Sequence, residues 1–452
     1  MFKRLNLIFG VVIVLMLMVT GCKSAAAPEE STTLEETSAS VETTASVETT
    51  VPATSSGEKV VLTLYTNYFG ADTKAPVLET ILKDFMKANP DIEVKPEYIT
   101  DTDMATKVET AFLANMEPDL ILHNWMGPSM EWKSNGVVVP VNQYLKDWGL
   151  IDKFKEAALN DFKELGSDDI SAFPLEGFNW PMWCNMEILK KAGVDKIPAT
   201  FDELIDAAKK IRAAGYQPFA IGGLDWTGSA LFHAGFAAAI DDATAKELWA
   251  KGGFSKNADA RAYVEAFLNL RKEGVFIDDV EGLDGNAMSV PFNEGKAAIT
   301  HAGSWSYSST PPEVAKNVVL AGLPLPPNAK GAVKPYWYSS FQAKGLWITR
   351  NGAKKIDAVE KFVKFFYQDK YMTLFVEASS MVPPFKEVKV DETKLSPLFV
   401  QSLKLDIEYI TPYPNLYAPA NLFDAWDRVA TMAYVPGTTA DDMLKAIDDL
   451  YK

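Results

Sequence analysis

The sequence predicts an α/β protein, because buried-strand patterns alternate with amphipathic helical patterns along most of its 452 residues. The first such strand, Val60–Tyr65, is a mainly apolar and β-branched run without alternation, which is typical of a parallel strand buried on both faces. About 390 residues follow a polar N-terminal segment, and this length is sufficient for two domains with hydrophobic cores.

The next elements follow from local patterns. A helix is expected after the first strand, with Pro76 in its first turn and Asn89-Pro90 as its stop. Its apolar residues have the spacing i, i+3, i+4 and i+7: Leu78, Ile81, Leu82 and Phe85. A strand at residues 92–98, a helix at about Met104–Asn115 and a strand at Leu120–Leu122 then complete parallel β-α-β units.

A capping box predicts the start of a later helix. Thr200 is the expected N-cap and Glu203 the third helical residue, and the apolar face that follows consists of Leu204, Ala208 and Ile211. Another core-facing helix is predicted late in the chain by Val359, Phe362, Val363 and Phe366.

Residues 1–21 have the pattern of a secretory signal peptide. Lys3 and Arg4 precede an apolar run from Leu7 to Val19, which is shorter than the about 20 residues that a membrane-spanning helix needs. The sequence Val19-Thr20-Gly21-Cys22 resembles the lipobox of bacterial lipoproteins. That resemblance implies that Cys22 is linked to diacylglycerol and becomes the mature N-terminus, which anchors the protein to a membrane.

The composition of residues 22–58 predicts a disordered tether. The hexapeptide ASVETT occurs twice in tandem, and the segment contains no aromatic residue. It cannot bury enough apolar area to offset the entropy lost on ordering. We therefore expect a folded body that begins at residue 59 and hangs from this tether.

Composition excludes several classes of function. The net charge of -16 repels nucleic acids, so no nucleic-acid partner is expected. If Cys22 carries lipid, Cys184 has no partner for a disulfide. The three histidines are scattered, and no metal-binding, phosphate-loop or EF-hand spacing occurs. We therefore expect no metal and no cofactor.

Five segments, in this order, resemble the extracellular sugar-binding proteins of ABC transporters (solute-binding protein family 1). They are PDLILHNWM…NGVVVPVNQYL, MWCNMEILKKAGVDKIPATFDELIDAAKKI, FNEGKAAITHAGSWS, KGLWITRNGAKKIDAVEKFVKFF and PGTTADDMLKAIDDLYK. The resemblance covers nearly all of residues 59–452. It implies a two-lobed, periplasmic-binding-protein-like fold of type II, in which three chain crossings join the lobes and hinge bending closes them over a ligand.

The crossings are expected near Phe173, Thr300 and Ser340. The first lobe would then comprise residues 59–172 and 300–340, and the second lobe residues 173–299 and 341–452.

A sugar site needs flat aromatic side chains for the C–H faces of the rings, and polar groups for the hydroxyls. Open α/β sheets bind ligands in loops at the carboxyl ends of their strands. Tyr68 and Phe69 follow the first strand and Asn124 and Trp125 follow the third, so all four are candidates.

Further candidates come from the expected crossings and from a glycine-rich segment. Glu176 is favoured as a hydroxyl acceptor, because an ionised carboxylate makes strong hydrogen bonds. The resemblance places Trp305 in the cleft, which makes it the first choice for stacking. The remaining candidates are Asn179, Trp180, Asp225, Trp226, Tyr338 and Phe341.

These observations predict a monomeric, non-enzymatic receptor on the outer face of the cell membrane. It would capture a mono- or oligosaccharide and deliver it to an ABC permease. Two alternatives stay open. One is an anchored glycoside hydrolase, for which Glu176 and Asp225 could supply the two carboxylates. The other is a receptor for a non-sugar small solute.

Overall fold

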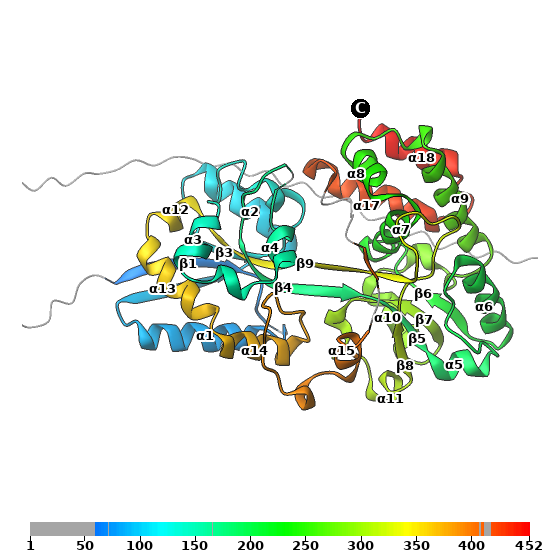
Figure 1. Cartoon of the computed structure of the whole chain (residues 1–452), viewed down its shortest axis with the longest axis horizontal. Helices are drawn as coiled ribbons and strands as arrows, with labels where there is room; N and C mark the ends of the chain where they lie inside the picture. The colour runs from blue at the N-terminus through cyan, green and yellow to red at the C-terminus, as the bar shows by residue number, and fades with distance from the viewer. Residues whose placement is uncertain (1–58, 71, 165, 406–407, 411–416) are drawn as a thin grey trace, which may run out of the picture. The chain divides into compact units, whose positions relative to one another are not determined.

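The computed structural model describes residues 59–452, apart from 71, 165, 406–407 and 411–416 (Figure 1). The predicted signal peptide, the lipidated Cys22 and the tether lie outside the described residues. In the described part of the chain, helices are too short or too polar to cross a membrane. Cys184 is buried there as a free cysteine.

The first sheet has the parallel β-α-β order that the sequence predicts. Its strand order is β10-β9-β3-β1-β2. β1 pairs in parallel with β2 and β3, whereas β9 runs antiparallel to β3. The strands are β1 (Val60–Thr66), β2 (Ile92–Tyr98), β3 (Leu120–His123), β9 (Tyr336–Ile348) and β10 (Glu408–Ile410).

Helices cover this sheet. The predicted apolar stripe of α1 is buried, and Phe85 packs edge-on against Phe362 with ring centroids 5.1 Å apart. Thr100 caps α2, whose start at Asp101 is earlier than the sequence suggests. The longer helices here are α1 (Ala75–Ala88), α2 (Asp101–Leu113), α13 (Ile356–Phe366) and α14 (Asp369–Ser379), and the shorter ones are α3 (Asn142–Asp147), α4 (Glu156–Asp161) and α12 (Arg350–Ala353).

A two-stranded ribbon leads from the first sheet to the second. β4 (Phe173–Trp180) pairs antiparallel with β9 along its whole length, with register shifts on both sides of Glu176. β5 (Met182–Asn185) follows β4 after one residue and lies in the second sheet. Figure 1 shows β4 and β9 as long strands that run together between the two groups of elements.

The second sheet has the order β6-β7-β5-β8. Its other strands are β6 (Gln217–Ala220), β7 (Ala297–His301) and β8 (Val318–Ala321). The surrounding helices are α5 (Met186–Lys191), α6 (Phe201–Ala213), α7 (Trp226–Ala239), α8 (Asp242–Lys251), α9 (Ala258–Lys272), α10 (Gly285–Asn293), α11 (Pro312–Ala315), α15 (Pro397–Ser402), α17 (Phe423–Thr431) and α18 (Ala440–Asp449).

Strand pairing differs from the expected division of the chain. Thr300 lies within β7 and β8 pairs with β5, so the chain returns to the second sheet after β7 and does not cross to the first. The end of β9 pairs with β3, and α13 packs on α1 and β1. Residues 300–321 therefore belong with the second sheet and residues 345–379 with the first, contrary to the expectation. Crossings occur at β4 and β9, near the expected Phe173 and Ser340.

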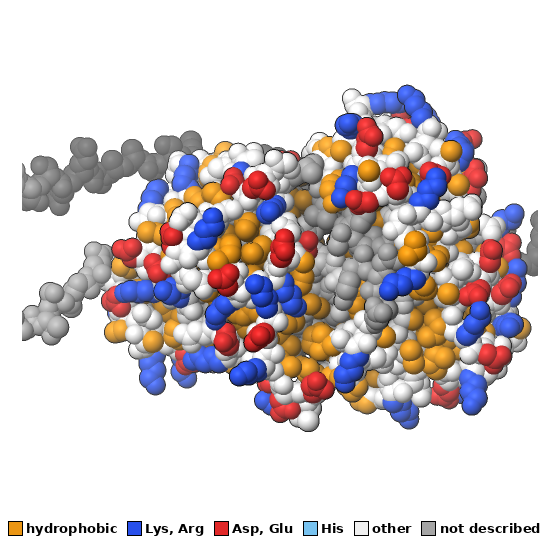
Figure 2. Space-filling model, in the orientation of Figure 1, with side chains coloured by type: hydrophobic (Ala, Val, Ile, Leu, Met, Phe, Trp, Pro, Cys, Tyr) orange, Lys and Arg blue, Asp and Glu red, His pale blue; other side chains and the backbone are white. Residues whose placement is uncertain are grey.

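The exposed surface is charged but mixed. Figure 2 shows Lys and Arg side chains interspersed with Asp and Glu over the visible face. Many of these charges pair at short range, as between Lys153 and Asp369 at 2.7 Å. On this face, positive and negative side chains are therefore mixed, and no single acidic patch forms.

Candidate functional site

The carboxyl ends of the strands lie at the two ends of the ribbon. β3 and β4 both run antiparallel to β9, so β4 leaves the first sheet at the edge where β1, β2 and β3 end. In the second sheet, Met182 at the start of β5 pairs with His301 and Ala321 at the ends of β7 and β8. Loops from both sheets therefore gather along β4, which is where an open α/β sheet binds ligands.

Three tryptophans meet at the second-sheet end of the ribbon. Trp180 ends β4, Trp226 begins α7, and Trp305 lies in a 3₁₀ turn (Ser304–Ser306) after β7. The ring centroid of Trp180 lies 5.4 Å from that of Trp226 and 5.1 Å from that of Trp305. Trp180 is buried, whereas Trp226 and Trp305 are 48% and 42% exposed. The cluster thus has a buried base and two accessible rings.

Gly303 explains why Trp305 can lie where it does. A Cβ atom at Gly303 would be 2.1 Å from the indole ring of Trp305, so any side chain there would force the ring out of this position. The glycine lets the ring fold back over the backbone that follows β7. The Gly-Ser-Trp sequence is therefore a local requirement of this aromatic wall.

His301 supports the buried base of the cluster. Its ring stacks on Trp180 with centroids 4.9 Å apart, and its Nε2 lies 3.1 Å from the Trp180 carbonyl oxygen. Burial lowers the pKa of His301 to about 3, although the hydrogen bond to that carbonyl raises it. The imidazole is therefore neutral at physiological pH and acts as a packing partner.

The three tryptophans wall a pocket of about 410 Å³. The helix α10 contributes Asn286, Ser289 and Asn293, which sequence analysis did not select although their i, i+3, i+7 spacing puts them on one helix face. Further polar lining comes from Asp225, Thr227, Thr300, Ser306, Ser309 and Thr310. Flat apolar walls with hydroxyl and amide groups between them form a site for a polyhydroxylated ligand.

Asp225 organises the pocket. Its Oδ1 accepts hydrogen bonds from the backbone N–H and the hydroxyl of Thr227, and its Oδ2 accepts one at 2.8 Å from the Gly285 N–H. This carboxylate therefore caps α7 and ties it to the start of α10. It is the only charged side chain among the described residues that line the pocket.

At the first sheet, the Glu176 carboxylate contacts a tyrosine hydroxyl and a lysine. Its Oε2 accepts a hydrogen bond from the Tyr68 hydroxyl at 2.9 Å, and its Oε1 lies 3.4 Å from Lys74 Nζ. Burial and then the adjacent Glu176 hold the pKa of Tyr68 well above its usual range. Tyr68 and Glu176 therefore form a hydrogen-bonded pair with Lys74 beside the carboxylate.

Asn124 belongs to a second polar network, which is partly exposed. Lys344 Nζ donates to Asn124 Oδ1 and to Asp101 Oδ1, the latter at 3.1 Å. His123 Nδ1 lies 3.4 Å from the same Asp101 oxygen. Because the Asn124 carbonyl oxygen is taken by Lys344, its amide NH₂ is the group left to meet a ligand.

Three predicted candidates lie in the core. Trp125 is buried, where it stacks on Trp347 with an interplanar angle of 5°. The Asn179 Oδ1 accepts a hydrogen bond from the Tyr307 hydroxyl at 3.0 Å. Tyr338 is buried against Phe178. These side chains shape the fold around the site and do not line the pocket.

The two remaining candidates lie on the first sheet and the ribbon. Phe341 is half-buried, with Lys155 Nζ 5.4 Å from its ring centroid. Phe69 is exposed after β1. Neither lines the tryptophan pocket.

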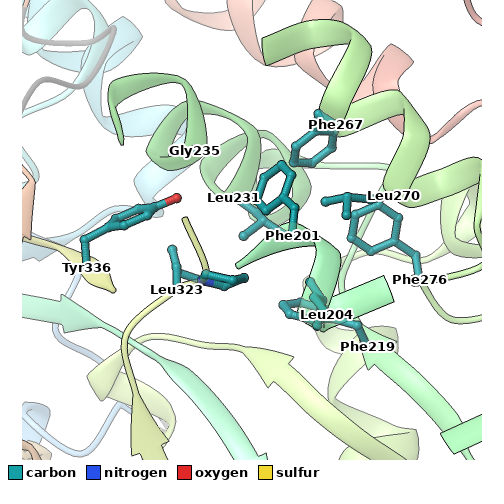
Figure 3. A pocket seen from close by; sticks show the side chains of 11 residues that line it. Phe201, Leu204, Phe219, Leu231, Gly235, Phe267, Leu270, Phe276, Leu323 and Tyr336 are labelled. Carbon is teal, nitrogen blue, oxygen red and sulfur yellow. The ribbon is translucent and has the colours of Figure 1, made fainter. Parts of the chain in front are cut away.

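Another void in the second lobe is too small for a ligand. Figure 3 shows apolar side chains converging on it from α6, α7, α9 and β6. Its volume is about 20 Å³. This is hardly more than a water molecule needs, so it is a packing defect of the core. The described residues hold no cluster of His, Cys, Asp or Glu able to bind a metal ion.

Two sheets joined by a ribbon, with a tryptophan-walled polar pocket at the strand ends, define a two-lobed binding protein. The chain belongs to the bacterial extracellular solute-binding protein family, whose model matches residues 70–373. Membership confirms the prediction of a solute-binding protein, not an enzyme. It also agrees with the predicted location outside the cytoplasm.

Curated relatives have names that refer to sugars. The chain is 27% identical over 292 residues to the maltotriose-binding protein of Pyrococcus abyssi. This alignment covers 64% of this chain and 59% of that protein. It is 28% identical over 179 residues to a probable sugar-binding periplasmic protein of Rhizobium meliloti, with 39% of this chain and 42% of that protein covered. The alignments thus span less than two thirds of either relative.

Solved structures share the fold. A probable secreted solute-binding lipoprotein from Streptomyces coelicolor has a TM-score of 0.77 and 30% identity, over 87% of this chain and 99% of that one. A chitin oligosaccharide binding protein has a TM-score of 0.75 at 22% identity, over 87% of this chain and 98% of that one. The type II two-lobed fold predicted from the sequence is confirmed.

Proposed function

We propose that this protein captures an uncharged saccharide and delivers it, as a monomer, to the permease of an ABC importer. The observation that carries the proposal is the pocket of about 410 Å³ walled by Trp180, Trp226 and Trp305. Its exposed indole faces suit the C–H faces of sugar rings, and its hydroxyl and amide groups suit the ring hydroxyls. The sugar-binding names of the curated relatives support this choice of ligand.

The electrostatics of the pocket favour a ligand without charge. Among the described lining residues Asp225 alone is charged, and it already accepts three hydrogen bonds from the protein. Two further carboxylates, Asp424 and Asp427, interact with each other near Asp225. Their negative potential would repel a sugar phosphate or a uronic acid.

The buried indole N–H of Trp180 offers a further polar contact. It has no hydrogen-bond partner among the described residues, although the ring lines the pocket. This N–H is buried, so a sugar hydroxyl would satisfy it only after the surrounding rings move. Together with the amide of Asn124 from the first lobe, it is a candidate donor to the ligand.

Attachment to the membrane is part of the same proposal. The signal pattern followed by Val19-Thr20-Gly21-Cys22 supports lipidation of Cys22, and residues 22–58 would serve as the tether. A ligand that contacts both lobes favours the closed state because it makes more contacts there, and the permease would recognise that state.

A thermal-shift screen tests the saccharide proposal. The panel consists of linear neutral oligosaccharides of one to six rings in three series, built from α-1,4-glucose, β-1,4-xylose and β-1,4-N-acetylglucosamine. Glucuronic acid and glucose 6-phosphate serve as charged counterparts. A ligand at 100 times its Kd should stabilise the protein by about 2.7 kcal/mol, visible as a higher Tm. A response to the acidic sugars alone, or to no saccharide, would contradict the proposal.

A further inference from the structure

Exposed aromatic side chains occur in two pairs. Among the residues that the structure describes, four aromatic side chains are about two fifths or more exposed: Phe69, Tyr98, Trp226 and Trp305. The second pair belongs to the pocket in the second lobe. The first pair lies in the first lobe and includes Tyr98, which the sequence did not single out.

Phe69 and Tyr98 contact each other across two adjacent parallel strands. Phe69 follows the end of β1, and Tyr98 is the last residue of β2, where it pairs in register with Thr66. Their ring centroids are 5.8 Å apart at an interplanar angle of 44°. The Trp226–Trp305 pair has nearly the same geometry, with 6.0 Å and 46°.

Both pairs lie at an edge of a sheet that the ribbon joins to the other sheet. β1 and β2 end at the edge of the first sheet from which β4 departs, and β7 ends where β5 begins. Leaving such rings partly in water forgoes some of the favourable free energy of burying their apolar area. Among the other residues whose burial the structure describes, no aromatic side chain is as exposed as these four.

Polar groups stand next to the first pair. Asn67, which precedes it, donates from Nδ2 to Asp101 Oδ1 at 2.8 Å, while its own Oδ1 is buried without a partner among the described residues. The hydroxyls of Thr100 and Thr102 lie 3.0 Å apart at the start of α2. A flat apolar surface bordered by acceptors and hydroxyls has the same chemistry as the pocket in the second lobe.

We infer that Phe69 and Tyr98 form a second sugar-stacking platform. The ligand is then a neutral oligosaccharide of at least two rings, one on each platform, so that it contacts both lobes. This inference rests on the proposed saccharide function and adds the length of the ligand. Trp125, which the sequence suggested for stacking in the first lobe, is buried, and Phe69 with Tyr98 takes that role.

The test compares ligand lengths in two variants. Calorimetric titrations use the series that stabilises the wild-type protein in the thermal-shift screen, from one ring to six. We expect Tyr98→Ala to weaken binding of the longest ligand by about 10-fold to 50-fold. Binding of the shortest ligand, which fills the tryptophan pocket alone, should change by less than about 2-fold. Tyr98→Phe keeps the ring and should retain wild-type affinity for every length.

Leu113→Ala is the matched control, because Leu113 is 81% exposed at the other end of α2. It should leave all affinities unchanged. If Tyr98→Ala and the wild-type protein bind every ligand length with equal affinity, the second platform is wrong. If Trp305→Ala weakens saccharide binding in the same experiment, the proposed function still stands. If no saccharide binds the wild-type protein, both proposals fail together. A ligand of one ring that binds as tightly as the longer ones would also overturn the inference.

Discussion

Trp305 owes its exposure to the backbone before it. Gly303 leaves room for the indole to fold back, and the ring remains 42% exposed although it contacts Trp180 and Trp226. A side chain held by its neighbours but open on one face is pre-organised for stacking. Trp249, in contrast, is fully buried in the second lobe and has only a packing role.

We predict that Trp305→Ala lowers saccharide affinity by about 30-fold to 1000-fold, the range of a binding hot spot. Its free energy of unfolding without ligand should change by less than about 1 kcal/mol, because the ring is not a core residue. Trp249→Ala is the control and should lose about 3 to 5 kcal/mol of stability. Titration calorimetry and denaturant unfolding measure the two quantities. Unchanged affinity in folded Trp305→Ala would remove this residue from the site.

Asp427 shows how a single partly buried carboxylate affects stability. It lies on α17 and faces α7, where the Ser229 hydroxyl donates to it and His233 Nε2 is 3.9 Å away. Burial, together with the nearby Asp424 and Asp225, raises the pKa of Asp427 to about 6. The folded protein therefore binds a proton there more tightly than the unfolded chain does.

We predict that Asp427→Asn stabilises the protein at about pH 8 by roughly 1 to 3 kcal/mol, because a tenfold change in proton affinity corresponds to about 1.4 kcal/mol. The carboxylate costs free energy only when ionised, so this gain declines as the pH falls through 6 and vanishes below the ordinary value of 3.8. Denaturant unfolding of both proteins across this range measures the difference. Buried His301 destabilises both proteins alike in acid, since burial lowers its pKa to about 3. A difference that is constant with pH would contradict the raised pKa.

The ribbon is the element that unites the site. Lys344 on β9 is buried and donates to Asp101 at the start of α2 and to Asn124 after β3. Burial opposes ionisation of Asp101, but the nearby His123 and the charge of Lys344 hold the pKa of this carboxyl well below its usual range. One side chain of the ribbon thus neutralises a carboxylate and orients a candidate ligand donor.

We predict that Lys344→Met destabilises the protein at neutral pH by about 1 to 3 kcal/mol, because it removes the buried cation that donates to the half-exposed Asp101 carboxylate and to Asn124. The loss should shrink as the solution is acidified, since Asp101 without its partner regains a higher pKa and protonates. Adding Asp101→Asn to this variant should restore part of the stability. Denaturant unfolding of the single and double variants measures the coupling, and additive losses would show that the two residues do not interact.

At the scale of the whole molecule, the folded body and its N-terminal extension have separate roles. The folded body supplies both aromatic pairs and the pocket, whereas the extension supplies the expected anchor. We propose that a lipid at Cys22 would keep the receptor at the membrane and that residues 22–58 would act as its tether.

We predict that Cys22→Ser abolishes incorporation of labelled fatty acid when the full chain is expressed in a lipoprotein-processing bacterium. The serine hydroxyl does not form the thioether that retains the lipid. Metabolic labelling followed by electrophoresis measures the outcome. Label retained at the N-terminus of this variant would show that the lipobox interpretation is wrong.

We also predict that deleting residues 24–57 leaves both Tm and saccharide affinity unchanged. The segment has no aromatic residue and supplies no core, so its loss removes no packing. Thermal unfolding and titration of the truncated protein beside the mature chain provide the comparison. A substantially lower Tm would mean that the extension packs against the body.

The sequence alone determined those features that depend on residues close together along the chain, such as helix faces and helix caps. The i, i+3, i+4, i+7 stripe of α1 predicted its burial, and Thr200 caps α6 as its capping pattern indicated. The apolar run of β1 predicted its strand but only part of its burial, since Val60 is 40% exposed. These features are readable because strand and helix periods fix which side chains share a face. The family resemblance carried the two-lobed fold, which the family match confirmed.

Only the tertiary structure decided which aromatic side chains are exposed. Trp125 and Trp305 both follow strands, yet Trp125 packs on Trp347, which lies more than 200 positions away in the sequence, whereas Trp305 stays open. The same holds for β8, whose place beside β5 no local pattern specifies, and for Tyr98, which meets Phe69 only because β1 and β2 are paired. Burial is set by contacts between distant segments, and a side chain's position in the sequence does not contain that information.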